Sequence, residues 1–208
     1  MKALILKDLY VLKTQFKLLG AFVLIYGIFA AYMKNAGMLG GVVCVLAAMS
    51  PLSALAYDER AKWDKYALTM PVTRAKMVLS KYVLGLMLCG LAFLIYVLFC
   101  VLVLKEQASA SLAAGAVLLF AALFYMAITF PLLFKLGVER GRIAMFLAVL
   151  IPAGLIGILP FATIHSGQNP ELLKAQLMPF LTFAPVVLAV LFVLSMLLSV
   201  HIYKKRDL

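Results

Sequence analysis

Long apolar stretches separated by short charged segments form the dominant pattern along the chain. A helix that crosses the hydrocarbon of a bilayer needs about 20 apolar residues. Six stretches lack Asp, Glu, Lys and Arg altogether: 18–33, 35–57, 82–104, 107–134, 143–170 and 175–203. Five exceed that length, and the first can span if Lys17 and Lys34 extend their side chains to the two interfaces. The pattern therefore predicts an all-α, polytopic membrane protein with six transmembrane helices.

The chain is predicted to form one transmembrane domain, residues 1–208, and the charged segments between the apolar stretches predict its organisation. An amphipathic elbow helix on the inner leaflet is expected first, because Ile5, Leu9, Leu12 and Phe16 form an apolar stripe at helical spacing. The predicted order along the chain is the elbow helix (1–17), spans 1 and 2 (18–57), a cytoplasmic segment (58–81), spans 3 and 4 (82–134), a second cytoplasmic turn (135–142), spans 5 and 6 (143–203) and a cytoplasmic tail (204–208).

The composition agrees with lipid as the solvent of this chain. Of its 208 residues 66% are hydrophobic and 13% charged, whereas a soluble domain averages about 45–50% apolar and about 25% charged residues. A chain this short buries only part of its surface. These values exclude a soluble monomer, a disordered chain and a disulfide-stapled secreted scaffold.

The basic residues predict the orientation of the spans. Positive charge accumulates on the cytoplasmic side of a membrane protein, and sixteen of the 19 Lys and Arg residues fall on one predicted side. Both termini are therefore expected in the cytoplasm. The net charge of +11 follows from this topology and from attraction to anionic headgroups, so no nucleic-acid partner is predicted. The three exceptions are Lys34, Lys105 and Lys174.

Candidate catalytic chemistry is lacking in the predicted spans. None carries a charged residue near its middle, the usual mark of an ion pathway. The motifs HExxH, GxSxG and GxxxxGK[ST] do not occur. Cys44, Cys89 and Cys100 are interpreted as small buried apolar residues. We therefore expect a non-enzyme without metal or cofactor of its own, which receives energy from another chain.

The cytoplasmic segment 58–81 is the place where such energy could enter. Trp63, Tyr66, Ala67 and Met70 share one helical face, and Pro71 ends the predicted helix. Two readings of this helix remain open. It lies on the lipid with its aromatic residues among the headgroups, or it docks into a groove of a cytoplasmic partner.

Local charges support a helix over the first half of this segment. Asp58 with Lys62, and Arg60 with Asp64, are opposite charges at i,i+4 spacing, each pair contributing about 0.2–0.5 kcal/mol. Thr73 is a predicted N-cap for the next helix, which runs into the third span.

Two motifs resemble those of a known family. Met70-Pro71-Val72-Thr73-Arg74 followed by Ser80-Lys81-Tyr82 is similar to the "Leu-Pro-Val-Ser-Arg … Ser-Lys-Tyr" segment of permease subunits of bacterial type 2 ATP-binding cassette (ABC) exporters. Pro131-Leu-Leu-Phe-Lys-Leu-Gly-Val-Glu-Arg-Gly-Arg142 is similar to the end of their fourth span. The branch resembled includes exporters of phenol-soluble modulins and other antimicrobial peptides.

The resemblance implies partners and site residues. Such permeases lie in the bacterial plasma membrane as dimers, with a second copy or a paralogue, and each binds a cytoplasmic ATPase subunit that holds the ATP and magnesium. Helix 58–70 would be the main coupling helix and turn 135–142 the second contact, with the first, second and fifth spans lining the cargo path. The implied coupling residues are Asp58, Glu59, Arg60, Lys62, Trp63, Tyr66, Pro71, Arg74, Lys81, Lys135, Glu139 and Arg142.

Proline and glycine mark two further places in the spans. Pro152, Gly154, Gly157 and Pro160 predict a broken or re-entrant fifth span that forms an extracellular gate with an outside hairpin at 161–177. The second span begins with three glycines within five residues, a pattern that suits close helix packing at a dimer contact or around a narrow lumen. They are Gly37, Gly40 and Gly41.

The sequence favours an exporter permease for hydrophobic or amphipathic cargo, because its predicted path is apolar and uncharged. Two alternatives stay open. One is a membrane scaffold or sensor that recruits a cytoplasmic partner through residues 58–81. The other is a secondary carrier, against which the uncharged spans count.

Overall fold

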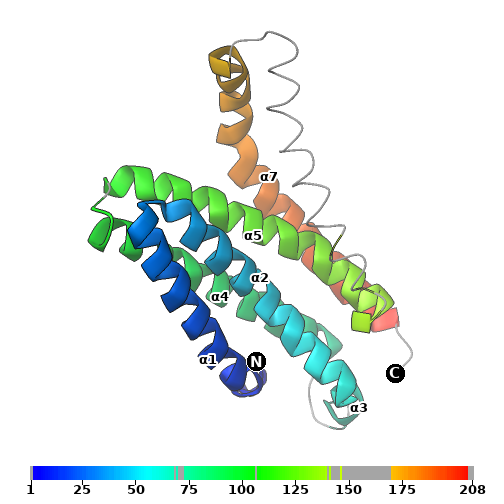
Figure 1. Ribbon diagram of the computed structural model, residues 1–208. Helices are drawn as coiled ribbons and strands as arrows, with labels where there is room; N and C mark the ends of the chain where they lie inside the picture. The colour runs from blue at the N-terminus through cyan, green and yellow to red at the C-terminus, as the bar shows by residue number, and fades with distance from the viewer. Residues whose placement is uncertain are drawn as a thin grey trace.

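The described part of the chain is helical throughout. The computed structural model describes residues 2–67, 69, 73–105, 107–139, 141, 146 and 170–205, with the side chains of 2, 64, 65 and 170–184 excepted. The main helices, labelled as in Figure 1, are α1 (Lys2–Met33), α2 (Ala36–Arg60), α3 (Trp63–Ala67), α4 (Arg74–Leu102), α5 (Ala108–Leu136) and α7 (Pro170–Lys205).

Five of these helices carry segments long and apolar enough to cross a membrane, so the chain is a multi-pass membrane protein. The segments are Ala3–Met33, Ala36–Arg60, Arg74–Leu102, Ala108–Leu136 and Pro185–Lys205. They match the predicted spans 1 to 4 and 6. The predicted fifth span, 143–170, lies largely outside the described residues, and so does the predicted gate of Pro152, Gly154, Gly157 and Pro160.

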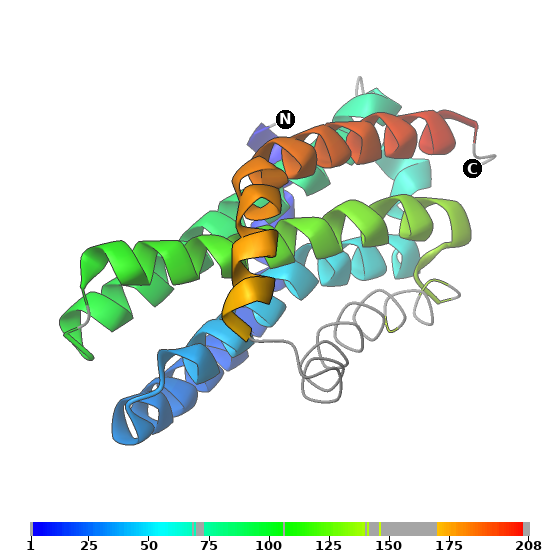
Figure 2. The same ribbon diagram turned by 90° about the horizontal axis from the view of Figure 1, so that it is seen from above.

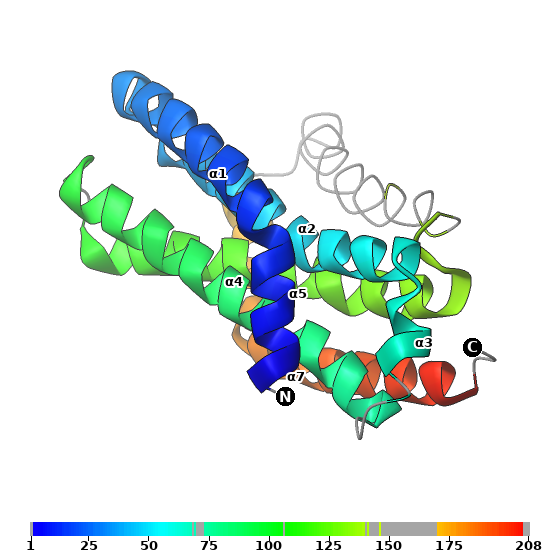
Figure 3. The same ribbon diagram turned by 90° about the horizontal axis from the view of Figure 1, so that it is seen from below.

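Two boundaries differ from the prediction. Residues 2–17 are helical, but they continue without a break into the first span, because no proline interrupts residues 2–33. Figure 3 shows only a change of direction partway along α1. Residues 170–177, expected in an outside hairpin, are the first turns of α7, since Pro170 at the first helical position suits a helix start.

Three lysines in the turns after helices have the positive φ that glycine usually supplies at such places. Lys34 (φ 51°), Lys62 (φ 49°) and Lys105 (φ 54°) follow α1, α2 and α4 respectively. The next helix after Lys34 is capped by Asn35, whose side chain accepts a hydrogen bond from the N–H of Gly37 at 3.0 Å. Thr73 is the residue before α4, as predicted, with extended backbone and without a side-chain hydrogen bond to the helix.

The helices form one bundle, in which α4 contacts α1, α2, α5 and α7. Figure 2 shows α7 crossing α5, and Tyr82 of α4 fills the space between them. Its ring lies 4.6 Å from that of Phe130 and 5.3 Å from that of Phe192, measured between centroids. Gly40 allows α2 to approach α4 and α5, since a Cβ there would lie 2.7 Å from the ring of Tyr96. This glycine therefore serves packing within one chain.

The two ends of the bundle differ. The turns after α1 and α4 lie together at one end, while α3, the first turns of α1 and the last turns of α7 lie at the other (Figure 1). We call the latter the α3 end. All ion pairs found among the described residues are there.

Candidate functional site

A ring of four charged side chains joins three helices at the α3 end. Lys7 and Asp8 come from α1, Asp58 from the last turn of α2 and Lys81 from the second turn of α4. Lys81 Nζ lies 2.8 Å from Asp8 Oδ1 and 2.6 Å from Asp58 Oδ2. Lys7 Nζ lies 2.5 Å from Asp58 Oδ1 and 3.1 Å from Asp8 Oδ1. Each lysine therefore contacts both aspartates, and the ring closes on itself.

The ring can be buried because its charges sum to zero. Asp8 is 1% exposed, Lys81 5% and Asp58 7%, and burial of an uncompensated charge is costly. Apolar side chains surround it, with Leu4, Leu55 and Met77 lining a hollow beside the charges. In such surroundings the ion pairs are screened far less than at a surface.

Trp63 connects this ring to α3. The Nζ of Lys7 lies 4.6 Å from the centre of the Trp63 ring, a cation–π contact. The indole is half-buried against the main apolar core and lines the same hollow. Trp63, expected at the tip of a docking helix, therefore faces the bundle. Only the five residues from Trp63 to Ala67 form α3, because Lys62 breaks the helix that was expected to start at Asp58.

Glu59 joins the two segments that the sequence assigned to separate partner contacts. Its Oε2 accepts a hydrogen bond from the backbone N–H of Val138 at 2.6 Å. The preceding Gly137 ends α5 with φ 79°, and a Cβ there would lie 2.6 Å from Glu59 Oε1. The end of α2 and the turn after α5 are thus held together, and glycine is required at that turn.

Arg74 joins the start of α4 to the end of α7. Its guanidinium Nη1 donates a hydrogen bond to the carbonyl oxygen of Lys204 at 2.8 Å. Deeper in the same helix pair, the hydroxyl of Tyr82 lies 2.8 Å from those of Ser195 and Ser199. Ser195 also donates to the carbonyl oxygen of Ala127 on α5 at 2.6 Å. Polar contacts therefore fix α7 to the bundle.

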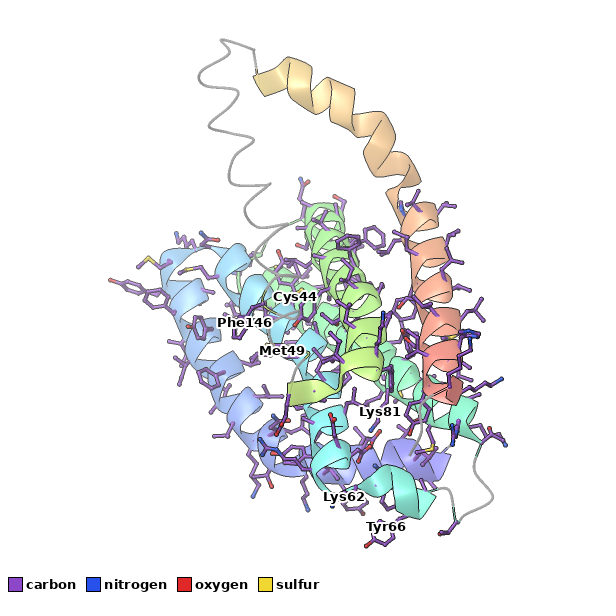
Figure 4. All side chains as sticks on the ribbon, turned by 90° about the vertical axis from the view of Figure 1, so that its right-hand side faces the viewer. Cys44, Met49, Lys62, Tyr66, Lys81 and Phe146 are labelled. Carbon is purple, nitrogen blue, oxygen red and sulfur yellow. The ribbon has the colours of Figure 1, made fainter. Side chains whose placement is uncertain are left out.

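The remaining predicted coupling residues divide into two groups. Tyr66 is 64% exposed, and Figure 4 shows it at the outer tip of the α3 end, with Lys62 nearby and Lys81 further inside the bundle. Four other predicted residues are also exposed: Arg60, Lys62, Lys135 and Glu139. Pro71 and Arg142 lie outside the described residues.

Two predicted roles need correction. Asp58 and Lys81 were expected on a surface that meets a partner, but both are buried and face each other. Asp58 was also expected to pair with Lys62 on one helix. Lys62 instead lies beyond the end of α2 in a left-handed turn, which takes it off the helical face that Asp58 occupies.

Lys7 and Asp8 were missed as functional residues. A signal was present, because Asp8 stands three residues after Ile5 and four before Leu12, within the apolar stripe of its helix. A charge at such a position must find a buried partner. The sequence alone does not say which lysine supplies it.

The described residues hold no group of three or more His, Cys, Asp and Glu suited to a metal ion. Cys89 and Cys100 are buried and Cys44 is half-buried, all three as free thiols. The interpretation of the cysteines as small apolar residues fits these positions.

Comparison with known proteins identifies the family. Residues 3–204 match the model of the family described as "ABC-2 family transporter protein". No curated protein and no solved structure matches the chain. The family match covers almost the whole length and agrees with the multi-pass bundle. The chain therefore belongs to the ABC-2 family of transporter proteins, the membrane-spanning components of ABC transporters.

Proposed function

We propose that this chain is the permease subunit of an ABC exporter, driven by a separate cytoplasmic ATPase subunit that docks at the α3 end. The family match over residues 3–204 is the observation that carries this proposal. Two copies, or one copy and a paralogue, would form the path. The alternative of a scaffold that transports nothing is an outcome of the experiment below.

The surface of the α3 end supports docking rather than burial in lipid. We call the exposed side chains at α3 and at the two adjoining helix ends the docking surface. It combines an exposed aromatic residue with charges of both signs, the composition of an interface hot spot with a polar rim. Its members are Arg60, Lys62, Tyr66, Lys135 and Glu139.

The hydrogen bond between Glu59 and Val138 supports a single docking unit. The two parts of the docking surface belong to different helices, α2–α3 and the end of α5. Because Glu59 ties these helix ends together at 2.6 Å, an ATPase that pushes on one part displaces both. The α3 end would face the cytoplasm, as the distribution of lysine and arginine predicts.

The cargo class follows from the apolar spans. Ionisable residues inside a membrane mark paths for ions and polar solutes, and the buried charges described here lie only at the α3 end. Hydrophobic or amphipathic molecules, including amphipathic peptides, suit such a path. The resemblance to the exporters of antimicrobial peptides favours peptides among them.

Co-expression with an ABC ATPase encoded beside this chain tests the proposal. We expect the two proteins to co-purify in detergent and ATP turnover to rise in proteoliposomes when amphipathic peptides are added. Tyr66→Ala should weaken the association about tenfold, the effect of losing an interface anchor of about 1–2 kcal/mol.

Tyr32→Ala is the matched control, because Tyr32 is 83% exposed at the opposite end of α1 and should leave the association unchanged. Co-purification without any peptide-dependent turnover or transport would favour the scaffold. Equal binding by both variants would show that α3 lies on lipid instead.

A further inference from the structure

α1 is the span least held by the rest of the chain. Only 6% of its apolar window is buried, against 50% for α2 and 33% for α4. Its first turns are different, because Asp8 and Leu12 are buried there. Leu12 packs in a small apolar cluster with Ala54 of α2 and Leu84 of α4. The N-terminal third of α1 is therefore a main attachment of this helix to the bundle.

The four-charge ring makes one ionic contact across each pair of the three helices. Lys7–Asp58 joins α1 to α2, Asp8–Lys81 joins α1 to α4, and Asp58–Lys81 joins α2 to α4. These three contacts hold the three helices together at one place, and separating ion pairs in an apolar setting is costly. Trp63, against Lys7, adds α3 to the same unit.

We propose that the ring makes the first turns of α1 one rigid unit with α2, α3 and α4. Lys7 and Asp8 are then positioning residues, which transmit a displacement of α3 to the first span. The rest of that span is loosely packed. This inference rests on the proposed function, because the displacement is supplied by the docked ATPase. The ring itself, however, is a property of the chain alone.

The double variant Lys7→Met/Asp8→Asn removes the ion pairs between α1 and the other two helices without leaving an unbalanced charge in the ring. It removes one positive and one negative charge, so the remaining Asp58–Lys81 pair stays neutral. Both ion pairs between α1 and the other two helices are lost, while the Asp58–Lys81 pair still joins α2 and α4. Lys13→Met is the matched control, because Lys13 is an exposed lysine on the same helix.

Spin labels on α1 and α2 provide the measurement. Tyr10→Cys and Tyr57→Cys are both exposed and would be labelled in a background in which Cys44, Cys89 and Cys100 are alanine. Distances are recorded for the chain alone, with the ATPase, and with the ATPase and ATP. We expect one narrow distribution at the same position in all three states, and at least twofold broadening in Lys7→Met/Asp8→Asn but not in Lys13→Met.

A shift of the distance on addition of ATP would overturn the proposal, and so would a double variant as narrow as the parent chain. If the proposed function fails, no variant binds the ATPase, yet the distances in the chain alone still test the ring. If the double variant does not fold, hydrogen exchange of the parent chain tests the link between α1 and α4 instead. Amides around Asp8 should exchange as slowly as those around Lys81, and exchange more than tenfold faster at Asp8 would refute the link.

Discussion

Replacement of Lys81 by methionine tests whether the ring is held by its charge balance. Methionine keeps the length and apolar stem of lysine, so the main change is the loss of one positive charge. The two aspartates, which accept contacts from Lys81 at 2.8 and 2.6 Å, would then share Lys7 alone. A net negative charge would remain at a buried position.

The expected cost follows from that buried charge. Removing one partner of a buried ion pair typically destabilises a protein by 3–5 kcal/mol. Lys7 stays in place and is more exposed than the other members, so we expect the lower end of this range. The loss of about 3 kcal/mol corresponds to roughly a 150-fold change in the unfolding equilibrium.

Chemical unfolding of the purified protein in detergent measures this free energy. The double variant Lys81→Met/Asp8→Asn restores neutrality and should cost only about 1 kcal/mol, because the Lys7–Asp58 pair remains satisfied. Lys76→Met, an exposed lysine of the same helix, should change stability by less than about 0.5 kcal/mol. If Lys81→Met matches Lys76→Met, or if the double variant is less stable than the single one, the reasoning from charge balance is wrong.

Three further substitutions should change the same free energy of unfolding. Gly137→Ala should cost about 1–2 kcal/mol, because φ is 79° and the new Cβ meets a glutamate oxygen; a neutral result would refute the need for glycine. Tyr82→Phe should cost about 1–2 kcal/mol through two lost hydroxyl contacts, whereas equal stability to Tyr125→Phe would contradict that role. Gly40→Ala should cost about 1–3 kcal/mol by overpacking, while Gly41→Ala, with open space around it, should not; equal effects would place Gly40 outside the tight contact.

The all-helical, multi-pass character of the chain and its family could be argued from the sequence, because they depend on local quantities. An apolar run of about 20 residues predicts a span wherever it occurs. Two of the predicted spans, 35–57 and 107–134, appear within about three residues of their expected bounds as Ala36–Arg60 and Ala108–Leu136. The expected coupling helix was less accurate. Its start at Asp58 was inferred from i,i+4 spacing alone, which cannot reveal that α2 continues to Arg60 and that Lys62 then turns the chain.

The candidate site could not be predicted from the sequence, for a different reason. Lys7 and Lys81 are 74 residues apart in the sequence, and both meet the same aspartates only after three helices have packed. Basic residues near a predicted membrane boundary are normally explained by topology, so these two lysines looked like the others. Their role depends on burial, which no local pattern of the sequence encodes.

The three lysines with positive φ relate the place where a helix ends to its depth in the bilayer. Glycine would adopt the same backbone conformation with less strain, but it would carry no ammonium group to hold that point among the headgroups. The turns after α1 and α4, which carry Lys34 and Lys105, lie at one end of the bundle, and the turn between α2 and α3, which carries Lys62, lies at the other. We expect these ends to meet the two membrane interfaces. On this expectation the lysines in the turns that follow the helices set the depth of the bundle in the membrane. Exchanging them for glycine should let the bundle shift along the membrane normal without unfolding it.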